Sequence, residues 1–183
     1  MNFTFNYFRH KFPGKRQFGI LTPEELTYTR EHFPEDLFLF LEEEGYCSYG
    51  NGFFHFVNPA DYREILSEWP KVPGEYQVFC RTGMGDLILW GEEQVHILHV
   101  HTGYFSTISE SMFDFFKFSL GDTQYVDNVL YKKQFDQARQ MLGELDQDEC
   151  YSFVPALAMG GDESAENLHK MKIWDSLSLL SQL

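Results

Sequence analysis

Three histidines in one short stretch form the group whose types and spacing best suit chemistry. His96, His99 and His101 lie in an alternating apolar and polar segment that is typical of a β-strand. On a strand, His99 and His101 share one face and His96 lies on the other. Two imidazoles on one face can bind zinc or iron, and a catalytic site adds a third ligand, for which His55 or a neighbouring acid is a candidate. The alternative is a set of solvated or hydrogen-bonded histidines at the edge of the core.

A glycine-rich segment, Gly83-Met84-Gly85-Asp86, raises the question of a phosphate-binding loop. Such a loop presents consecutive N–H groups, leads into a helix and usually carries a lysine. Here strands are predicted on both sides, and no lysine follows. The segment therefore predicts a tight turn between two strands, with Asp86 accepting hydrogen bonds from the N–H groups of the turn.

Support for nucleophilic or acid–base catalysis is weak. Cys80 lies in an apolar strand, where a thiol is usually inert, and nothing places a histidine beside Cys47 or Cys150. There is no Gly-x-Ser-x-Gly elbow. The paired acids Asp148 and Glu149 precede a strand, so we expect them to face solvent or to cap. The sequence predicts a protein that is not an enzyme, with no catalytic residue, no metal site and no cofactor.

The segment Tyr49-Gly50-Asn51-Gly52 predicts a tightly folded, exposed loop, because glycine and asparagine tolerate a positive φ. Loops of this kind on a rigid scaffold often carry binding, although a purely structural turn is the alternative. Aromatic residues cluster around it, and such residues are favoured at interface hot spots. About half of the strand 53–57 must face the core, so Tyr46 and Tyr49 are the aromatic residues expected to be exposed.

The elements that position these groups predict an α+β fold. Thr22, Pro23 and Glu25 form a capping box at a helix start, and Asn58-Pro59 marks another. We expect an antiparallel sheet with helices on one side and at its ends. The expected helices begin at Pro23 and Pro34 and span 59–68, 109–118, 122–130, 132–142 and 174–182. The expected strands are 53–57, 76–81, 86–90, 95–101, 104–108, 153–159 and 167–173.

Composition indicates a compact chain with ample core material. Of the 183 residues 43% are apolar and 17% aromatic, enough for one domain or two small fused lobes. The stretch from Trp69 to Gly74 is rich in proline and suggests a division near residue 70. We expect an N-terminal region 1–70 and a C-terminal region 71–183, packed as one globular unit. Oligomeric state stays open.

Charge and cysteine usage limit the partners and the compartment. The formal net charge is −14, which makes bare nucleic acid an unlikely partner and favours fast encounter with a basic one. Three widely spaced cysteines are neither a disulfide framework nor a zinc motif. No apolar run suits a signal peptide or the roughly 20 residues of a membrane span. We expect a cytoplasmic protein that contacts neither nucleic acid nor membrane.

The first 16 residues differ in charge from the rest of the chain. Arg9, Lys11, Lys15 and Arg16 give them +4, which leaves −18 for the remainder (−14 minus +4). A basic arm that recruits nucleic acid is one interpretation. The other is a terminal segment that packs against the acidic body or frays.

Several segments carry a family resemblance. In chain order they are 44–54, 81–87, 148–157, 167–172 and 178–183. In this order and spacing the chain resembles the GAD-like immunity proteins found beside type VI secretion DNase toxins, distant relatives of the broader SMI1/KNR4-like immunity group. The similarity runs from about Phe18 to the last residue. It implies an SMI1/KNR4-like fold and a protein that binds and silences a toxin without chemistry of its own.

The resulting hypothesis is an immunity protein that occludes the DNA-binding or active surface of a cognate, basic nuclease. The acidic composition is compatible with it, because complementary charge raises the rate of association. The alternative is a small metal-dependent enzyme or ligand-binding protein that uses His99 and His101. The candidate partner-binding residues are Glu42, Glu43, Glu44, Tyr46, Tyr49 and Asn51.

Overall fold

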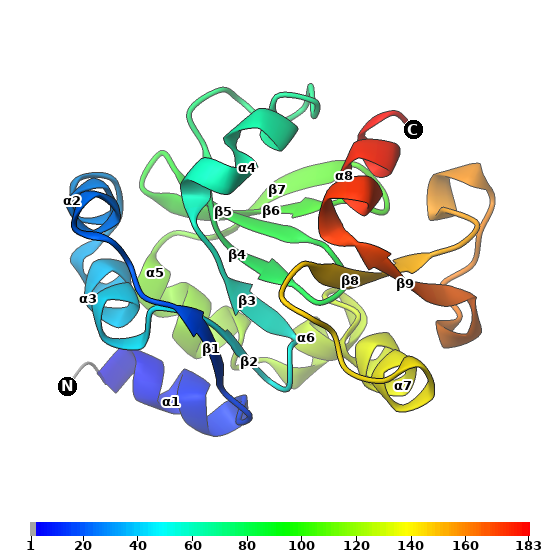
Figure 1. Cartoon of the computed structure of the whole chain (residues 1–183), viewed down its shortest axis with the longest axis horizontal. Helices are drawn as coiled ribbons and strands as arrows, with labels where there is room; N and C mark the ends of the chain where they lie inside the picture. Colours follow the sequence, from blue (N-terminus) through cyan, green and yellow to red (C-terminus); the bar gives the residue numbers. More distant parts are fainter. Residues whose placement is uncertain (1–2) are drawn as a thin grey trace.

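The main feature of the fold is an antiparallel sheet whose strands follow chain order. The computed structural model describes residues 3–183, and in that range the main sheet has seven strands in the order β1 to β7 (Figure 1). A separate antiparallel pair, β8 and β9, follows near the C-terminus. The strands are β1 Arg16–Gly19, β2 Tyr46–Tyr49, β3 Phe54–Phe56, β4 Gln77–Thr82, β5 Leu87–Gly91, β6 Gln94–His99, β7 Tyr104–Ser109, β8 Glu149–Phe153 and β9 Leu168–Lys172. The predicted α+β class is confirmed. The sheet also runs across residue 70, since β3 pairs with β4.

The helices are short and interspersed with the strands. They are α1 Phe3–Lys11, α2 Pro23–His32, α3 Glu35–Glu44, α4 Pro59–Leu66, α5 Met112–Asp114, α6 Thr123–Asn128, α7 Lys132–Leu142 and α8 Ile173–Ser181. A π-helical turn, Phe115–Ser119, follows α5, and two 3₁₀ turns, Leu157–Met159 and Ala165–Asn167, connect β8 to β9. Both predicted caps are present: the Thr22 hydroxyl and the Glu25 carboxylate form the capping box of α2, and Asn58 caps α4.

Helices cover both faces of the main sheet, so the prediction of helices on one side is wrong. The reason lies in β4, β5 and β6, which are buried on both faces. Val78, Leu89 and Leu98 face a core shared with α4 and α8. Phe79 and Ile97 face the opposite core, which α1, α3 and the π-helical turn cover. A strand with apolar residues at successive positions requires this double cover.

The larger core is aromatic and is built around the first helix. Phe8 is fully buried, and its ring lies 5.1 Å from that of Phe116 and 5.5 Å from that of Phe54. Phe5 stacks on Phe40 of α3 with ring centroids 4.4 Å apart. Such edge-to-face and offset pairs add to the free energy gained by burying the rings. Residues 3–11 of the basic N-terminal segment therefore form a helix that packs onto the body, which agrees with the second interpretation of its charge.

Two other local predictions are wrong. The strand expected at 153–159 ends at Phe153, because Pro155 has no N–H group with which to continue the ladder. The helix expected over 109–118 begins later and is capped by Ser111, whose hydroxyl accepts a hydrogen bond from the N–H of Asp114. Ser109 ends β7 and donates to the carbonyl oxygen of Ser111.

Replacing Phe8 with alanine tests whether α1 belongs to the folded core. We expect Phe8→Ala to lower the free energy of unfolding by about 3–5 kcal/mol, because it removes a fully buried ring and leaves a cavity. Tyr7 precedes it in the same helix but is 49% exposed, so Tyr7→Ala should change stability by less than about 0.5 kcal/mol. Urea denaturation of both variants measures the difference. If the two variants lowered the free energy of unfolding equally, the burial of Phe8 would make no specific contribution to stability.

Candidate partner-binding cleft

The three histidines do not form a joint site. β6 ends at His99, so His101 lies in the following turn and the expected shared strand face is wrong. His99 pairs through Nδ1 with Asp86 Oδ2 at 2.9 Å, and His101 donates from Nε2 to the carbonyl oxygen of Met84 at 2.8 Å. His96 donates from Nε2 to a third group, the carbonyl of Gly91. Within residues 3–183, no three His, Cys, Asp or Glu side chains are grouped so that they could hold a metal ion.

Asp86 joins two turns, whereas a role within its own turn was predicted. The turn between β4 and β5 is held by the hydroxyl of Thr82, which accepts from the N–H groups of Met84 and of Asp86 itself. The buried Asp86 carboxylate instead accepts from Val100 N at 3.0 Å and pairs with His99. Burial alone would lower the pKa of His99, but the hydrogen bond and charge of Asp86 outweigh it and raise that pKa. The tight turn itself is confirmed.

The predicted partner-binding residues divide into exposed and buried ones. Exposed side chains are those of Glu42 and Glu43 at the end of α3 and Asn51 in the turn after β2, whereas Tyr46 is half-buried. Tyr49 is only 3% exposed and Glu44 only 7%, so the expected exposure of Tyr49 is wrong. The physical reason is that Tyr49 belongs to a strand, not a loop, and α1 covers its ring, which lies 5.3 Å from that of Phe8.

Glu44 and Tyr49 instead form a buried polar link between α1 and the sheet. The Tyr49 hydroxyl donates to Glu44 Oε2 at 2.9 Å, and Arg9 Nη2 lies 2.6 Å from Glu44 Oε1. Lys15 forms a second ion pair with the same carboxylate. These contacts make both residues part of the scaffold that supports the exposed Glu42 and Glu43.

A large cavity lies where the N-terminal half of the chain meets the C-terminal part. Its volume is about 710 Å³, and we call it the junction cleft. One wall comes from β1, β2, β3 and the start of α4, and the other from residues 146–148 and the start of α8 (Figure 1). Four acids line it: Glu25, Asp61, Asp146 and Asp148.

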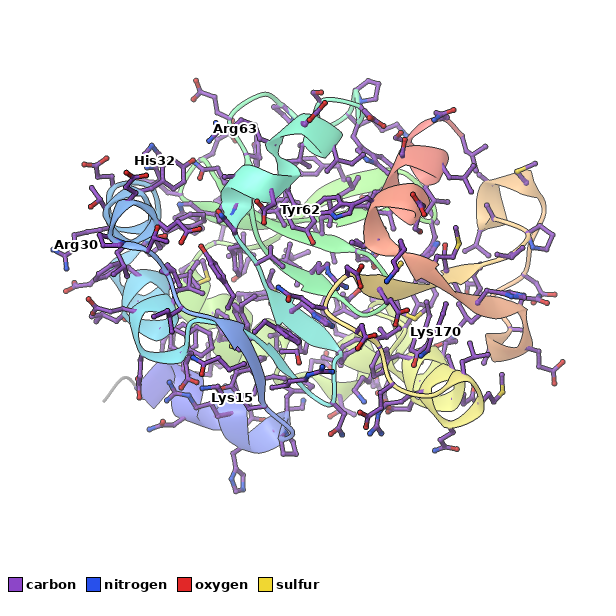
Figure 2. The ribbon with its side chains drawn as sticks, in the orientation of Figure 1. Lys15, Arg30, His32, Tyr62, Arg63 and Lys170 are labelled. Atoms are coloured by element: carbon purple, nitrogen blue, oxygen red, sulfur yellow. The ribbon has the colours of Figure 1, made fainter. Side chains whose placement is uncertain are left out.

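Five aromatic side chains line the junction cleft. The members are Phe18, Tyr46, Phe56, Tyr62 and Trp174. Tyr62 extends from α4 toward α8, where its ring lies 4.8 Å from that of Trp174 (Figure 2). Phe18 stacks flat on His55 at 5.8 Å, and the guanidinium of Arg16 lies 5.4 Å from the Phe18 ring. The contact between Tyr62 and Trp174 thus joins the two walls of the cleft. Arg16, Phe18 and His55 form a continuous surface on one of them.

The acids of the cleft differ in how they are neutralised. Asp148 pairs with Lys172 at 2.8 Å, and Asp146 lies 3.8 Å from Arg16. The carboxylate of Asp61 has no ion pair or hydrogen bond within residues 3–183, although its backbone N–H donates to the carbonyl oxygen of Asn58. Burial raises the pKa of Asp61, and the neighbouring carboxylate of Glu25 raises it further. A cation placed between Asp61 and Glu25 would relieve that repulsion.

Glu25 is the residue that fixes one wall of the cleft. Its Oε2 accepts from the N–H of Thr22 at 2.7 Å, and its Oε1 accepts from Asn58 Nδ2 at 2.7 Å. Asn58 in turn caps α4 through the N–H of Ala60. One carboxylate therefore joins the N-termini of α2 and α4.

A buried arginine lies behind the cleft and connects its two walls. Arg81 on β4 is 0% exposed, and no carboxylate of residues 3–183 lies within 4.0 Å of it. Its Nη2 donates to the carbonyl oxygen of Gln147 at 2.7 Å and to His55 Nδ1 at 3.5 Å. Burial lowers the pKa of His55 well below its usual value, and the charge of Arg81 lowers it further. His55 is therefore neutral, and its Nε2–H donates to the carbonyl of Gly52.

Comparison with known proteins supports the resemblance on which the sequence hypothesis rests. Residues 4–103 match the family model of the GAD-like domain, and residues 109–183 match that of the T6SS immunity protein Tdi1, C-terminal. The first match covers more than half of the chain, which therefore belongs to the GAD-like family. Its immunity branch, predicted from the motifs, is confirmed by the second match. The match begins at residue 4, so the similarity includes α1, which the sequence analysis left out. Kinship with the SMI1/KNR4-like group stays a prediction, as does the division at residue 70.

The fold is shared with a protein of known structure. The crystal structure of Atu4351 from Agrobacterium tumefaciens has a TM-score of 0.74 to this chain at 15% sequence identity, covering 97% of this chain and 88% of that one. At that identity the likeness concerns the fold alone. No curated protein matches the chain significantly. Within residues 3–183, every helix is too short or too polar to cross a membrane.

Sequence reasoning missed the junction cleft because no single segment contains it. Asp146 and Asp148 fall in a stretch that is visibly dense in acids, and that density was the available signal. Nothing in the sequence places them opposite Phe18, Asp61 or Tyr62. Of the predicted binding residues, only Tyr46 lines the cleft.

The link through Glu44 predicts a pH dependence of stability. Burial opposes ionisation of Glu44, but hydrogen bonds from Lys15 and Tyr49 and the charge of Arg9 outweigh it and lower its pKa. Its contribution to stability is therefore complete above the ordinary value of 4.5 and is lost as pH falls through the lower pKa of the folded state. At neutral pH we expect Glu44→Gln to cost about 1–3 kcal/mol of unfolding free energy.

Urea denaturation at neutral pH and at about pH 3 tests this linkage. The difference in unfolding free energy between wild type and Glu44→Gln should narrow in acid, because below the ordinary pKa of 4.5 the unfolded chain takes up a proton at Glu44 and the advantage of the folded state shrinks as pH falls. Glu42→Gln, at an exposed position two residues earlier in the same helix, is the matched control and should leave stability unchanged at both pH values. If the difference in unfolding free energy between wild type and Glu44→Gln did not change with pH, Glu44 would not be the group whose ionisation is coupled to stability.

Proposed function

We propose that this protein is a cytoplasmic immunity protein that binds and neutralises a cognate nuclease toxin of a type VI secretion system. The observation that carries the proposal is the pair of family matches, which together account for nearly the whole chain. The nuclease activity of the toxin, specifically on DNA, is what the sequence resemblance implies. The protein acts in this proposal by binding alone and has no catalytic residue.

The junction cleft is the surface that we assign to the toxin. Its acids and aromatic rings suit lysine and arginine side chains, because a cation gains from a nearby carboxylate and from the face of a ring. Asp61 and Tyr62 lie side by side on α4 and offer both groups in one place. The proposed occupant is a basic segment of the toxin.

Occupation of the cleft would neutralise a nuclease for a simple reason. A surface that binds DNA presents clustered lysine and arginine side chains to the phosphates. If the same side chains enter the junction cleft, they are no longer available to DNA. The net charge of −14 would accelerate the encounter, and the desolvated contacts inside the cleft would slow dissociation.

A second candidate surface comes from the residues singled out in the sequence. Glu42, Glu43 and Asn51 are exposed, whereas Glu44 and Tyr49 support them from below. Glu43 also contacts Arg9 at 3.2 Å, so its charge is partly neutralised within the protein. Because the charge of this surface is partly neutralised within the protein, we rank it behind the cleft.

Co-expression tests the immunity function itself. The protein encoded beside this chain, produced alone in Escherichia coli, should lower survival and degrade DNA, and co-expression of this chain should restore survival. The two proteins should then copurify as a stable complex. A toxic neighbour that this chain does not suppress, or a neighbour without toxicity, would refute the proposed function.

Neutralising the acids of the cleft tests the proposed surface. The triple variant Asp61→Asn, Asp146→Asn, Asp148→Asn should raise the dissociation constant for the toxin at least roughly 30-fold, mainly through faster dissociation. The matched control, Glu31→Gln, Glu75→Gln, Glu166→Gln, changes the net charge equally at exposed positions outside the cleft. It should alter only the association rate, and only a few-fold. Surface plasmon resonance separates the two rates.

The same measurement discriminates between the two surfaces. If the triple variant outside the cleft weakens binding as much as the triple variant inside it, charge acts only at long range and the cleft is not the contact surface. If Glu42→Gln, Glu43→Gln weakens binding and the cleft triple does not, the toxin binds at the end of α3. Melting temperatures of all variants show whether each is folded.

A further inference from the structure

The two edges of the main sheet differ in how they are protected against further pairing. The strand order leaves β1 and β7 with one neighbouring strand each (Figure 1). A free edge presents unpaired N–H and C=O groups, which proteins protect with charged residues, proline or irregular pairing. β1 is four residues long, carries Arg16 and has a register shift between Gln17 and Gly19. It is therefore a protected edge.

β7 lacks this protection over most of its length. Residues 104–107 include neither a charged residue nor proline, and the register shift of this strand comes after them, at Ile108. Within residues 3–183 the backbone of β7 bonds to β6, apart from one hydrogen bond that the Ser119 hydroxyl donates to the carbonyl oxygen of Ile108. The outer side of 104–107 is therefore available to another extended strand.

Exposed aromatic side chains lie at both ends of this free edge. Tyr104 begins the strand and is 61% exposed. The segment that Ser119 joins to the other end of β7 carries Phe113 and Phe118, two exposed rings whose centroids are 6.4 Å apart. Aromatic residues are enriched at protein interfaces relative to the rest of the surface. Their position beside an unprotected strand indicates that this edge is an interface.

We propose that β7 pairs antiparallel with β7 of a second copy of this chain, which joins the two main sheets into one. Antiparallel pairing of identical strands about a two-fold axis uses the same surface on both copies, so the assembly closes at two. Pairing of β7 with β1 of another copy would instead continue from copy to copy. The charge of Arg16 and the irregular pairing of β1 oppose that arrangement.

The charges at the ends of β7 fit this two-fold arrangement. Lys71 is exposed, and its ammonium lies near the start of β7, 3.9 Å from the position that a Cβ atom on Gly103 would occupy. Glu110 is exposed and directly follows the strand. Neither residue has an ion pair within residues 3–183. Antiparallel pairing places the start of one strand beside the end of the other, so Lys71 of each copy comes near Glu110 of its mate.

Sedimentation equilibrium of the full-length protein tests the proposal. At about 100 µM the wild type should have a weight-average mass close to twice the chain mass of 21.5 kDa. The variant Tyr104→Lys, Thr107→Lys places charges at the two exposed positions of 104–107. It should raise the dissociation constant of the pair at least roughly 30-fold, because like charges then meet across the paired edges.

The matched control is Ile20→Lys, Thr27→Lys, which adds the same charge at exposed positions on β1's side of the sheet. It should form the pair as the wild type does. A wild type that stays monomeric at 100 µM, or that grows beyond two copies, would overturn the proposal. So would equal weakening by both double variants, or pairing that persists in the variant of β7. Melting temperatures show whether each variant is folded.

Cross-linking provides a second test that does not require lysine in the strand. Ser106 lies within one residue of the expected two-fold axis, where equivalent residues of the two copies are at most about 8 Å apart. Ser106→Cys should therefore be cross-linked into a dimer by bismaleimidoethane, since the three native cysteines are buried. Ser178→Cys, similarly half-buried but on α8, is the control and should remain monomeric on denaturing gels. Equal cross-linking of the two variants would refute the pairing of β7.

This proposal is independent of the immunity function. No residue of β7 lines the junction cleft. The experiments use this protein alone, so their failure would leave the proposed binding of a toxin unaffected, and a failure to suppress a toxin would leave the pairing unaffected.

Discussion

The buried guanidinium of Arg81 is the interaction on which the arrangement of the two sheets depends. It lies on a central strand of the main sheet and reaches the carbonyl oxygen of Gln147, in the loop that enters β8. A second bond, from Tyr151 N to the carbonyl oxygen of Gly83, fixes β8 against the turn that follows Arg81. Burying a charge away from a carboxylate is costly, so the position depends on the neutral acceptors of its two terminal nitrogens, which are the carbonyl oxygens of Thr82 and Gln147 and Nδ1 of His55.

The charge of Arg81 has consequences for its surroundings. It helps to keep His55 neutral, and it opposes the effect of burial on Tyr62, whose pKa burial nevertheless raises to about 12. Both side chains line the junction cleft, and neither is ionised near neutral pH. The charges that a partner meets in the cleft are therefore those of its carboxylates and of Arg16, against a floor of neutral rings.

Features governed by neighbouring residues were predictable from the sequence. The capping box of Thr22 and Glu25, the cap at Asn58 and the turn at Gly83 depend on residues a few positions apart, and all three are present. The β-hairpins follow from alternation and turn residues in the same way. The family could be read from short motifs, and the segments that carry them lie within the two family matches.

Features governed by distant segments were not predictable. Tyr49 was expected at the surface because its own neighbours are glycine and asparagine, but α1 covers it from more than 35 positions away. The sequence left open whether His101 meets solvent, a metal ion or a hydrogen-bond partner, and the partner is the carbonyl of Met84, 17 positions away. The cleft requires Arg16 and Asp146 to come within 3.8 Å although 130 positions separate them. Patterns among neighbouring residues in the sequence do not indicate such contacts.

The way the cleft is built bears on how tightly it can bind. One wall is fixed by Glu25, which joins α2 to α4, and the other by Arg81, which holds Gln147. The loop that carries Asp146 and Asp148 is further restrained, because Asp146 N donates to Glu149 and the Tyr151 hydroxyl donates to the carbonyl of Gly143. A surface whose side chains are already ordered loses little conformational entropy when a partner arrives. Because the charges of the cleft are set by such fixed contacts, a basic segment that fits between Asp61 and Trp174 would keep most of its interaction energy as affinity. An immunity protein depends on that outcome, since its toxin must stay bound for as long as the cell is exposed to it.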